Sequence, residues 1–338
     1  MKEGIKMTSK QALLAASAAL LTGVAVMATT ASAQNQSGTY SADTVSVENF
    51  IGRIEVRTGS SNQVSVAISN PGDRAEDPVY SQSGNRVEID GGQRIRNLNC
   101  NTRNGQMRVG RRFSMNDIED YPLLTITAPA DIALELSRSA FKGEAGDLGS
   151  LDLSMSSCGR FEGGDILDEA AIRISGSGDV SLGTIGQSAS IEINGSGDVV
   201  MSDIAGSSSV NISGSGDVRT GNISGDAVVG INGSGDVQFG DVSGLSVRIS
   251  GSGDVEAQSL EGAFDARISG SGDIHVHDGR AEPFEASIHG SGDIRFGGTA
   301  VNVSVRESGG GDIHIGEMEG TVNWHRNGRT VLRVGGAD

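Results

Sequence analysis

The phrase ISGSGDV at Ile174–Val180 is the first of seven closely similar copies that decide the fold of this chain. The others are INGSGDV at Ile193–Val199, ISGSGDV at Ile212–Val218, INGSGDV at Ile231–Val237, ISGSGDV at Ile249–Val255, ISGSGDI at Ile268–Ile274 and IHGSGDI at Ile288–Ile294, and an altered copy, SGGGDI, follows at Ser308–Ile313. Their aspartates are 18 to 20 residues apart. A period this steady indicates one structural unit that stacks on copies of itself.

Apolar and polar residues alternate around each phrase. In the first copy Ile172, Ile174, Val180 and Leu182 are the apolar positions. This period of two, built largely from β-branched residues, predicts strands rather than helices. One repeat of about 19 residues holds two short strands and cannot bury its apolar residues alone. We therefore expect an all-β fold, a single-chain parallel β-solenoid (β-helix) with a right-handed coil and about 4.8 Å between rungs.

The alternation also predicts which residues of the phrase face solvent. Gly176 and Gly178 share the inward side with the isoleucines, as expected where no Cβ fits, and Ser175, Ser177 and Asp179 face outward. A polar stripe then follows one edge of the solenoid. The candidate binding residues on it are Ser177, Asp179, Ser196, Asp198, Ser215, Asp217, Ser234, Asp236, Ser252, Asp254, Ser271, Asp273, Ser291 and Asp293.

Stacked carboxylates repel one another by about 1 kcal/mol per neighbouring pair in water, so something must offset the charge. One explanation is solvent together with hydrogen bonds from nearby backbone N–H groups. The alternative is bound calcium, since the phrase is similar to the calcium-binding nonapeptide repeats of other solenoids. The period of about 19 residues and the missing second glycine-rich half-turn favour the first explanation. We expect no cofactor and no resident metal, with calcium as the alternative.

Residues 1–33 have the pattern of a secretory signal peptide. Lys2, Lys6 and Lys10 precede an apolar run that ends before Ala31-Ser32-Ala33, an A-x-A cleavage site. A membrane anchor is the alternative, but polar residues interrupt the short run. We expect an exported, periplasmic or cell-surface protein without a transmembrane segment after cleavage. The net charge of the full chain, −17, argues against nucleic acid as the main partner.

The region 34–133 is rich in strand patterns but lacks the phrase. We therefore expect an irregular β-rich region that continues into a regular solenoid over 134–338, closed by a C-terminal cap.

An arginine cluster lies within the region 34–133. Its members are Arg94, Arg96, Arg103, Arg108, Arg111 and Arg112. Such a cluster is either solvated, paired with the protein's own carboxylates, or in contact with an anionic glycan.

The chain contains two cysteines, Cys100 and Cys158. In an oxidising compartment they form a disulfide between the N-terminal region and the first rungs, or they stay as two buried thiols. Sequence alone leaves both interpretations open.

Two kinds of chemistry, a zinc site and an enzyme site, have little support in the sequence. His275 and His277 share one face of a strand and His314 occupies the repeat position of His275 two rungs on, but no third close zinc ligand is evident, so we interpret them as surface histidines. Sugar-cleaving enzymes also use β-helices, yet the near-identical rungs offer no cleft of unlike acid residues. An envelope polysaccharide-active enzyme therefore remains only a second alternative.

The signal peptide, the strands at Val45–Val47 and Ile54–Val56 and the tandem I-[SN]-G-S-G-D-[VI] phrases together resemble the bacterial adhesins of the GIN head-domain type, whose function is unknown. The resemblance covers nearly all of the mature chain. It implies a β-solenoid at or beyond the cell envelope and brings no catalytic residues. We expect no β-barrel translocator of a complete autotransporter in this chain.

Together these observations predict an exported, non-catalytic binding or structural module that presents the repeated Ser/Asp edge. Many weak, identical contacts along a rigid edge would give avidity. Cell-surface glycan and envelope proteins are the expected partners, and the sequence does not indicate the oligomeric state.

Overall fold

The computed structural model describes residues 36–70, 74–96, 98–103, 106–111 and 114–334. The predicted signal peptide, residues 1–33, lies outside them. The first strands are β1 (Gln36–Tyr40), β2 (Thr44–Glu48), β3 (Ile51–Gly59), β4 (Val64–Ser69), β5 (Val79–Ser83), β6 (Arg86–Asp90), β7 (Asn99–Arg103), β8 (Gln106–Arg111), β9 (Ser114–Asp117) and β10 (Leu123–Pro129), with one 3-10 turn, η1 (Ile118–Asp120), before β10.

The remaining strands build the repeats. They are β11 (Ala133–Ala145), β12 (Ser150–Glu162), β13 (Ala170–Ile174), β14 (Asp179–Leu182), β15 (Ala189–Ile193), β16 (Val199–Met201), β17 (Ser208–Ile212), β18 (Val218–Arg219), β19 (Ile223–Ile231), β20 (Val237–Ile249), β21 (Val255–Ile268), β22 (Ile274–Ile288), β23 (Ile294–Glu307), β24 (Ile313–Arg326) and β25 (Arg329–Val334).

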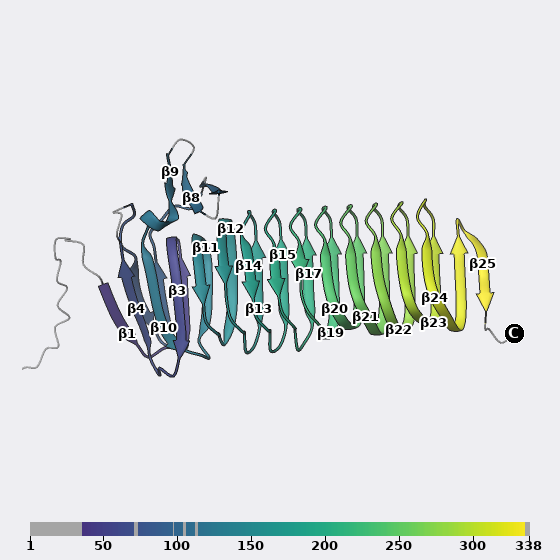
Figure 1. Cartoon of the computed structure of the whole chain (residues 1–338), viewed down its shortest axis with the longest axis horizontal. Helices are drawn as coiled ribbons and strands as arrows, with labels where there is room; N and C mark the ends of the chain where they lie inside the picture. The colour runs from purple at the N-terminus through teal and green to yellow at the C-terminus, as the bar shows by residue number, and fades with distance from the viewer. Residues whose placement is uncertain (1–35, 71–73, 97, 104–105, 112–113, 335–338) are drawn as a thin grey trace, which may run out of the picture. The chain divides into compact units, whose positions relative to one another are not determined.

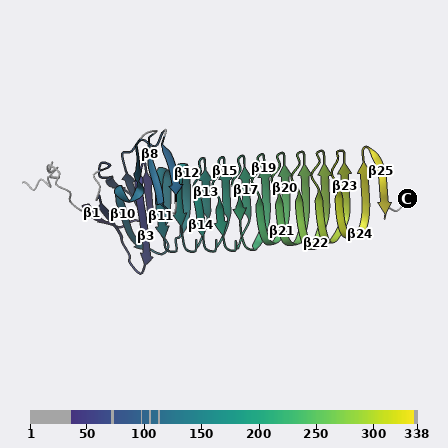
Figure 2. The same cartoon turned by 45° about the horizontal axis from the view of Figure 1, so that its top comes forward.

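These strands stack as the parallel coils of a β-solenoid of about ten turns (Figures 1 and 2). β13 pairs in parallel with β12 before it and β15 after it, and Ile172 lies in register with both Leu153 and Ile191. The second side of the coil, β14, pairs in the same way with β12 and β16. The predicted fold class, an all-β parallel solenoid with coils of about 19 residues, is confirmed.

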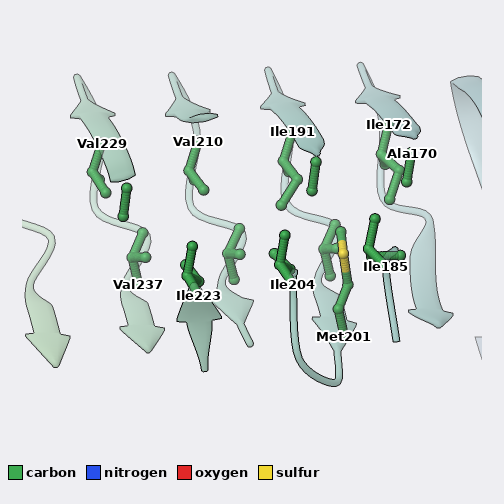
Figure 3. Packing of buried hydrophobic residues seen from close by; sticks show 14 of the residues in the cluster. Ala170, Ile172, Ile185, Ile191, Met201, Ile204, Val210, Ile223, Val229 and Val237 are labelled. Atoms are coloured by element: carbon green, nitrogen blue, oxygen red, sulfur yellow. The ribbon is translucent and has the colours of Figure 1, made fainter. Parts of the chain in front are cut away.

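Isoleucine and valine ladders fill the inside of the coils (Figure 3). Each apolar side chain lies on its counterpart in the next coil, so the core is thin but continuous, and stacking buries what one coil would expose. One ladder comprises Ile172, Ile191, Val210 and Val229, and another comprises Ile185, Ile204 and Ile223, all no more than 1% exposed.

The glycines of the phrase are required by contact between coils. A Cβ on Gly195 would lie 1.9 Å from the carbonyl oxygen of Gly176, and one on Gly197 would lie 2.0 Å from that of Gly178. None of these glycines has a positive φ. The stacking of one turn directly on the next, rather than an unusual backbone conformation, therefore excludes every side chain at these positions.

The N-terminal coils are stacked in an order that differs from the order of the chain. β2 and β3 pair in parallel with the two halves of β11. On their other side they pair in parallel with β6 and β10, which come later in the sequence. The chain therefore adds an outer coil behind β2 and β3 before it continues into β11.

Antiparallel strands finish both ends of the stack. β4 pairs antiparallel with β10 and β1, and β5 pairs antiparallel with β6. At the other end β25 folds back antiparallel on β24. Such strands end the parallel stacking and reduce the open sheet edges that would otherwise recruit another chain.

Between β6 and β10 the chain leaves the coils to form a small sheet of β7, β8 and β9, which projects from the side of the stack (Figure 1). Val109 and Ile118 of this excursion pack with Ile51 and Ala140 of the coils in a second apolar cluster. A disulfide joins Cys100 of β7 to Cys158 of β12, with their Cα atoms 6.0 Å apart.

Candidate functional site

The GSGD turns lie in one row along an edge of the stack, as the narrow turns between the long strands β20 to β24 show in Figure 1. The predicted alternation holds within the turn: Ser177 and Asp179 are exposed, Gly178 is buried and Gly176 is partly buried. All seven candidate serines are exposed, whereas the seven candidate aspartates are exposed or half-buried. The serines, which we call the serine edge, are Ser177, Ser196, Ser215, Ser234, Ser252, Ser271 and Ser291.

The aspartates have a structural role. In each, the Oδ1 atom accepts a hydrogen bond from the backbone N–H of the aspartate one coil further on. The N···Oδ1 distance is 2.7–3.0 Å in six of the seven steps and 3.5 Å in the first. We call this set the aspartate ladder; it runs through Asp179, Asp198, Asp217, Asp236, Asp254, Asp273, Asp293 and Asp312. Backbone N–H dipoles directed at the carboxylates thus oppose their mutual repulsion.

The serine hydroxyls are different. Their backbone N–H groups bond to carbonyl oxygens of the preceding coil, which belong to glycine in six of the seven cases, as from Ser196 to Gly176 at 2.8 Å, and to Ser157 in the case of Ser177. Over the described coils, the one hydrogen bond between side chains that involves these seven hydroxyls joins Ser271 and Ser291 at 3.3 Å. The turn uses their backbone but leaves the hydroxyls available to an outside group.

A second candidate surface lies where the excursion meets the coils. A cavity of about 590 Å³ is lined by Arg94 and Arg96 from the excursion and by Arg138 from β11. Arg138 is paired with Glu48, whereas Arg94 and Arg96 have no carboxylate partner among the described residues. The structure thus brings together two members of the predicted arginine cluster and adds Arg138, which the sequence pattern did not indicate. The side chains of Arg103 and Arg112 lie outside the described residues.

A third cluster joins the two histidines that the sequence placed on one face of a strand to Glu256, which the sequence interpretation did not include. His275 and His277 on β22 lie beside Glu256 on β21. Burial lowers the pKa of His275; the neighbouring His277 lowers it further, Glu256 opposes the shift, and Arg295 adds to the lowering. The repeat itself holds the signal for Glu256, because Glu256 and His275 both stand two residues after the aspartate of their phrase.

The solenoid and its row of turns define a repetitive scaffold whose most regular surface is a polar edge. The chain matches the family described as "Putative auto-transporter adhesin, head GIN domain" over residues 78–258 and 221–318, and it belongs to that family. This confirms the resemblance seen in the sequence. Membership makes the chain an adhesin-type protein, which implies export or surface exposure and favours a role other than catalysis.

Two solved structures are similar to the chain. One is a "putative adhesin" from Bacteroides fragilis NCTC 9343, with 13% identity over 84% of this chain and 97% of that chain and a TM-score of 0.27. The other is a "putative cell adhesion protein" from Clostridium sporogenes ATCC 15579, with 10% identity over 87% of this chain and 100% of that chain and a TM-score of 0.20. No curated protein matches the chain.

In the part of the chain that the structure describes, no helix has the length and apolar character to span a membrane.

Proposed function

We propose that this chain is an exported, non-catalytic binding module whose serine edge contacts an extended polysaccharide of the cell surface. The seven hydroxyls and the carboxylate oxygens that the aspartate ladder leaves free are the groups that would bind it. Polysaccharides that are neutral or carry amines suit this edge, since the chain has a net charge of −17 and the edge itself is acidic.

The serine that recurs at the same exposed position of the turn is the observation that carries the proposal. The glycines are fixed by contact between coils, and the aspartates by their hydrogen bonds to the next coil. No comparable contact explains why seven successive coils carry serine at the same exposed position in the described turns. A surface hydroxyl repeated in this way is accounted for by a repetitive ligand.

The geometry supports a linear polymer in particular. Parallel coils repeat at about 4.8 Å, which is close to the length of one sugar residue in an extended polysaccharide. Several successive hydroxyls can then meet successive sugars before the two spacings drift out of register. Each contact is weak, and affinity comes from their number on a rigid edge.

The test is binding of the full chain to three immobilised polysaccharides: dextran, which is neutral; chitosan, which carries amines; and alginate, which is anionic. A triple variant, Ser196→Ala, Ser215→Ala and Ser234→Ala, interrupts the serine edge without touching the aspartate ladder. We expect binding to dextran or chitosan to weaken at least tenfold, because the longest run of uninterrupted contacts is lost.

The matched control is Ser190→Ala, Ser202→Ala and Ser224→Ala, which removes three exposed serines of the same coils outside the phrase. It should bind like the unaltered chain. The proposal fails if both triple variants bind equally, or if the unaltered chain binds none of the polymers. Binding to alginate alone would also overturn it and would direct attention to Arg94 and Arg96.

A further inference from the structure

Three side chains on the outer surface of the coils converge just beyond the GSGD turns, on the strands that follow them. Glu256 of β21 and His275 of β22 are partners in the parallel register, and His277 follows two residues later. Residues two apart on a strand share a face, so both imidazoles stand on the side of the sheet that carries Glu256.

The donor atoms are close. His277 Nε2 lies 2.6 Å from Glu256 Oε1, and the two imidazole rings have centroids 4.0 Å apart. One donor atom of each residue lies within 4.8 Å of the other two. In a tetrahedral site with metal–ligand bonds of about 2.0–2.2 Å, neighbouring donors are separated by less than this, so small side-chain rotations suffice to bring them into place.

We propose that Glu256, His275 and His277 form a binding site for a divalent transition-metal ion, with Zn²⁺ as the best fit. Two imidazoles and one carboxylate are a donor set that binds zinc with a fourth position open. Imidazole nitrogen also disfavours Ca²⁺ and Mg²⁺, which take oxygen ligands. This site is chemically distinct from a calcium-loaded aspartate ladder.

Neighbouring side chains orient the carboxylate. Gln238, in register with Glu256 on β20, donates its amide N–H to Glu256 Oε2 at 3.3 Å. Arg219 in turn donates to Gln238 Oε1 at 3.2 Å. The chain of hydrogen bonds holds one carboxylate oxygen away from the imidazoles and leaves the other directed at His277, as second ligand layers do in metal sites.

The guanidinium of Arg295 does not compete with a metal ion for the space between the three ligands. Arg295 is the register partner of His275 on β23, but its guanidinium is bound to Asp293 at 2.7 Å and lies 3.8 Å from Asp273. Next to His277, the following coil carries Gly297, which has no side chain to cover the imidazole. The following coil therefore does not cover His277 with a side chain at this position.

The cluster also interrupts the repeat. The equivalent position two residues after the aspartate holds Ser181, Val200, Arg219, Gln238, Arg295 and His314 in other coils. The Glu-then-His sequence in adjacent coils, followed by a second histidine, occurs once among the coils that carry the phrase. A local departure of this kind is not needed for the fold, since the same backbone carries serine, valine, arginine or glutamine there in other coils.

Isothermal titration of the full chain with ZnCl₂ tests the site, with Co²⁺ as a spectroscopic probe, since tetrahedral Co²⁺ absorbs in the visible region. We expect one ion per chain. His275→Gln and His277→Gln should each weaken Zn²⁺ binding at least tenfold and abolish the Co²⁺ absorption, and Gln238→Ala should weaken binding about tenfold because it acts on ligand orientation.

The control is His314→Gln, an exposed histidine at the same repeat position two coils away, which should bind Zn²⁺ like the unaltered chain. Thermal unfolding of every variant in EDTA should match that of the unaltered chain, since the three ligands are surface residues. The proposal is overturned if the unaltered chain binds no Zn²⁺, if His275→Gln and His277→Gln bind it unchanged, or if Ca²⁺ displaces Zn²⁺ at equal concentration.

Discussion

Glu307 accepts a hydrogen bond from the backbone N–H of Ile313 at 3.1 Å, and this contact closes the last coil. In inner coils the equivalent N–H donates to the carbonyl oxygen of the next aspartate, as Val180 does to Asp198 at 2.9 Å. After Ile313 the chain adds no further coil, so that acceptor is missing. Glu307, which takes the place of the inward-facing Ile288, supplies it from inside.

Arg326 completes this end. Its guanidinium bonds to Glu307, whose side chain is almost fully buried, and donates at 2.6 Å to Asp312, the last member of the aspartate ladder. Asp312 has no following backbone N–H to accept, and Arg326 takes that role. The N–H of Ile313 and the carboxylate of Asp312 lack partners because the repeat ends, and the ion pair of Glu307 and Arg326 supplies a partner to each.

Replacing Glu307 should therefore destabilise the C-terminal coil in a graded way. Glu307→Ile restores the repeat residue but leaves the N–H of Ile313 without an acceptor and Arg326 without its buried partner, so we expect a loss of about 2 kcal/mol. Glu307→Gln keeps an acceptor oxygen and should lose about half as much. Urea unfolding and hydrogen exchange at the Ile313 amide measure both effects. Equal stability of the two variants would contradict this account of the end.

The aspartate ladder predicts that the stability of the fold depends on the side-chain oxygen that accepts the hydrogen bond and not on its negative charge. Asp254 Oδ1 accepts the N–H of Asp273 at 2.7 Å. Asp254→Asn keeps an acceptor and removes a neighbouring like charge, so its free energy of unfolding should be unchanged or higher. Asp254→Ala leaves that N–H without its partner and should cost about 1 kcal/mol. Asn222 already performs this role in a second ladder, where its Oδ1 accepts the N–H of Asp241 at 2.9 Å.

Thermal unfolding of Asp254→Asn and Asp254→Ala beside the unaltered chain measures the difference. A loss of stability in Asp254→Asn as large as in Asp254→Ala would mean that the negative charge itself is required. That result would favour a bound cation over the hydrogen bond.

The effect of a glycine substitution on stability should depend strongly on its position in the turn. A Cβ on Gly216 would lie 2.0 Å from the carbonyl oxygen of Gly197, so Gly216→Ala must separate two coils and should cost about 3 kcal/mol. Gly310 occupies the serine position of the last turn, where the nearest atom to an added Cβ is 4.0 Å away. Gly310→Ser should fold with unchanged stability. Similar melting temperatures for Gly216→Ala and Gly310→Ser would refute contact between coils as the reason for the glycines.

Much of this architecture was predictable because the repeat restates the same physical constraint in every coil. The alternation of apolar and polar residues around Ile174 and Val180 predicted the strands and the outward direction of Ser177. The spacing of about 19 residues between phrases predicted the coil. These are local properties, and seven copies of a weak signal make a strong one.

What the sequence did not indicate depends on contacts between coils or on the ends of the stack. Val45–Val47 and Val87–Ile89 carry the same strand pattern, so nothing local shows that β2 rather than β6 lies against β11. The sequence pattern gives no reason for Glu307 at a position that holds isoleucine in the preceding coils, because its partners Ile313 and Arg326 become its neighbours only where the coils end. Glu256 could have been paired with His275 by aligning the repeats at their aspartates.

The ion pair between Arg86 and Glu135 predicts how the N-terminal coils respond to pH. Arg86 Nη2 donates to Glu135 Oε1 at 2.7 Å, and its other terminal nitrogen bonds to the second carboxylate oxygen, so the pair bridges β6 and β11 across β2. The hydrogen bond from Arg86 is the main cause that lowers the pKa of Glu135 below its ordinary value. A lowered pKa stabilises the folded state while the carboxylate is ionised.

This contribution should be complete above the ordinary glutamate pKa and should disappear as pH falls through the lowered pKa of Glu135. Both side chains are more than one third exposed, so we expect about 0.5 kcal/mol at neutral pH. The measurement is the difference in unfolding free energy between the unaltered chain and Glu135→Gln from pH 7 down to pH 3. A difference that grows on acidification would have the wrong sign for this mechanism.

The two explanations of the aspartates predict opposite effects of calcium on the melting temperature. An ion that binds only the folded chain raises the melting temperature as its concentration rises. The ladder directs each Oδ1 at a backbone N–H, which leaves about one carboxylate oxygen per coil, whereas Ca²⁺ takes six to eight oxygen ligands. We therefore expect the full chain to melt at the same temperature in EDTA and in millimolar CaCl₂. A melting temperature that climbs with Ca²⁺, and climbs less in Asp254→Asn, would instead assign the ladder to calcium. The binding assays on the serine edge would then have to be repeated with calcium present.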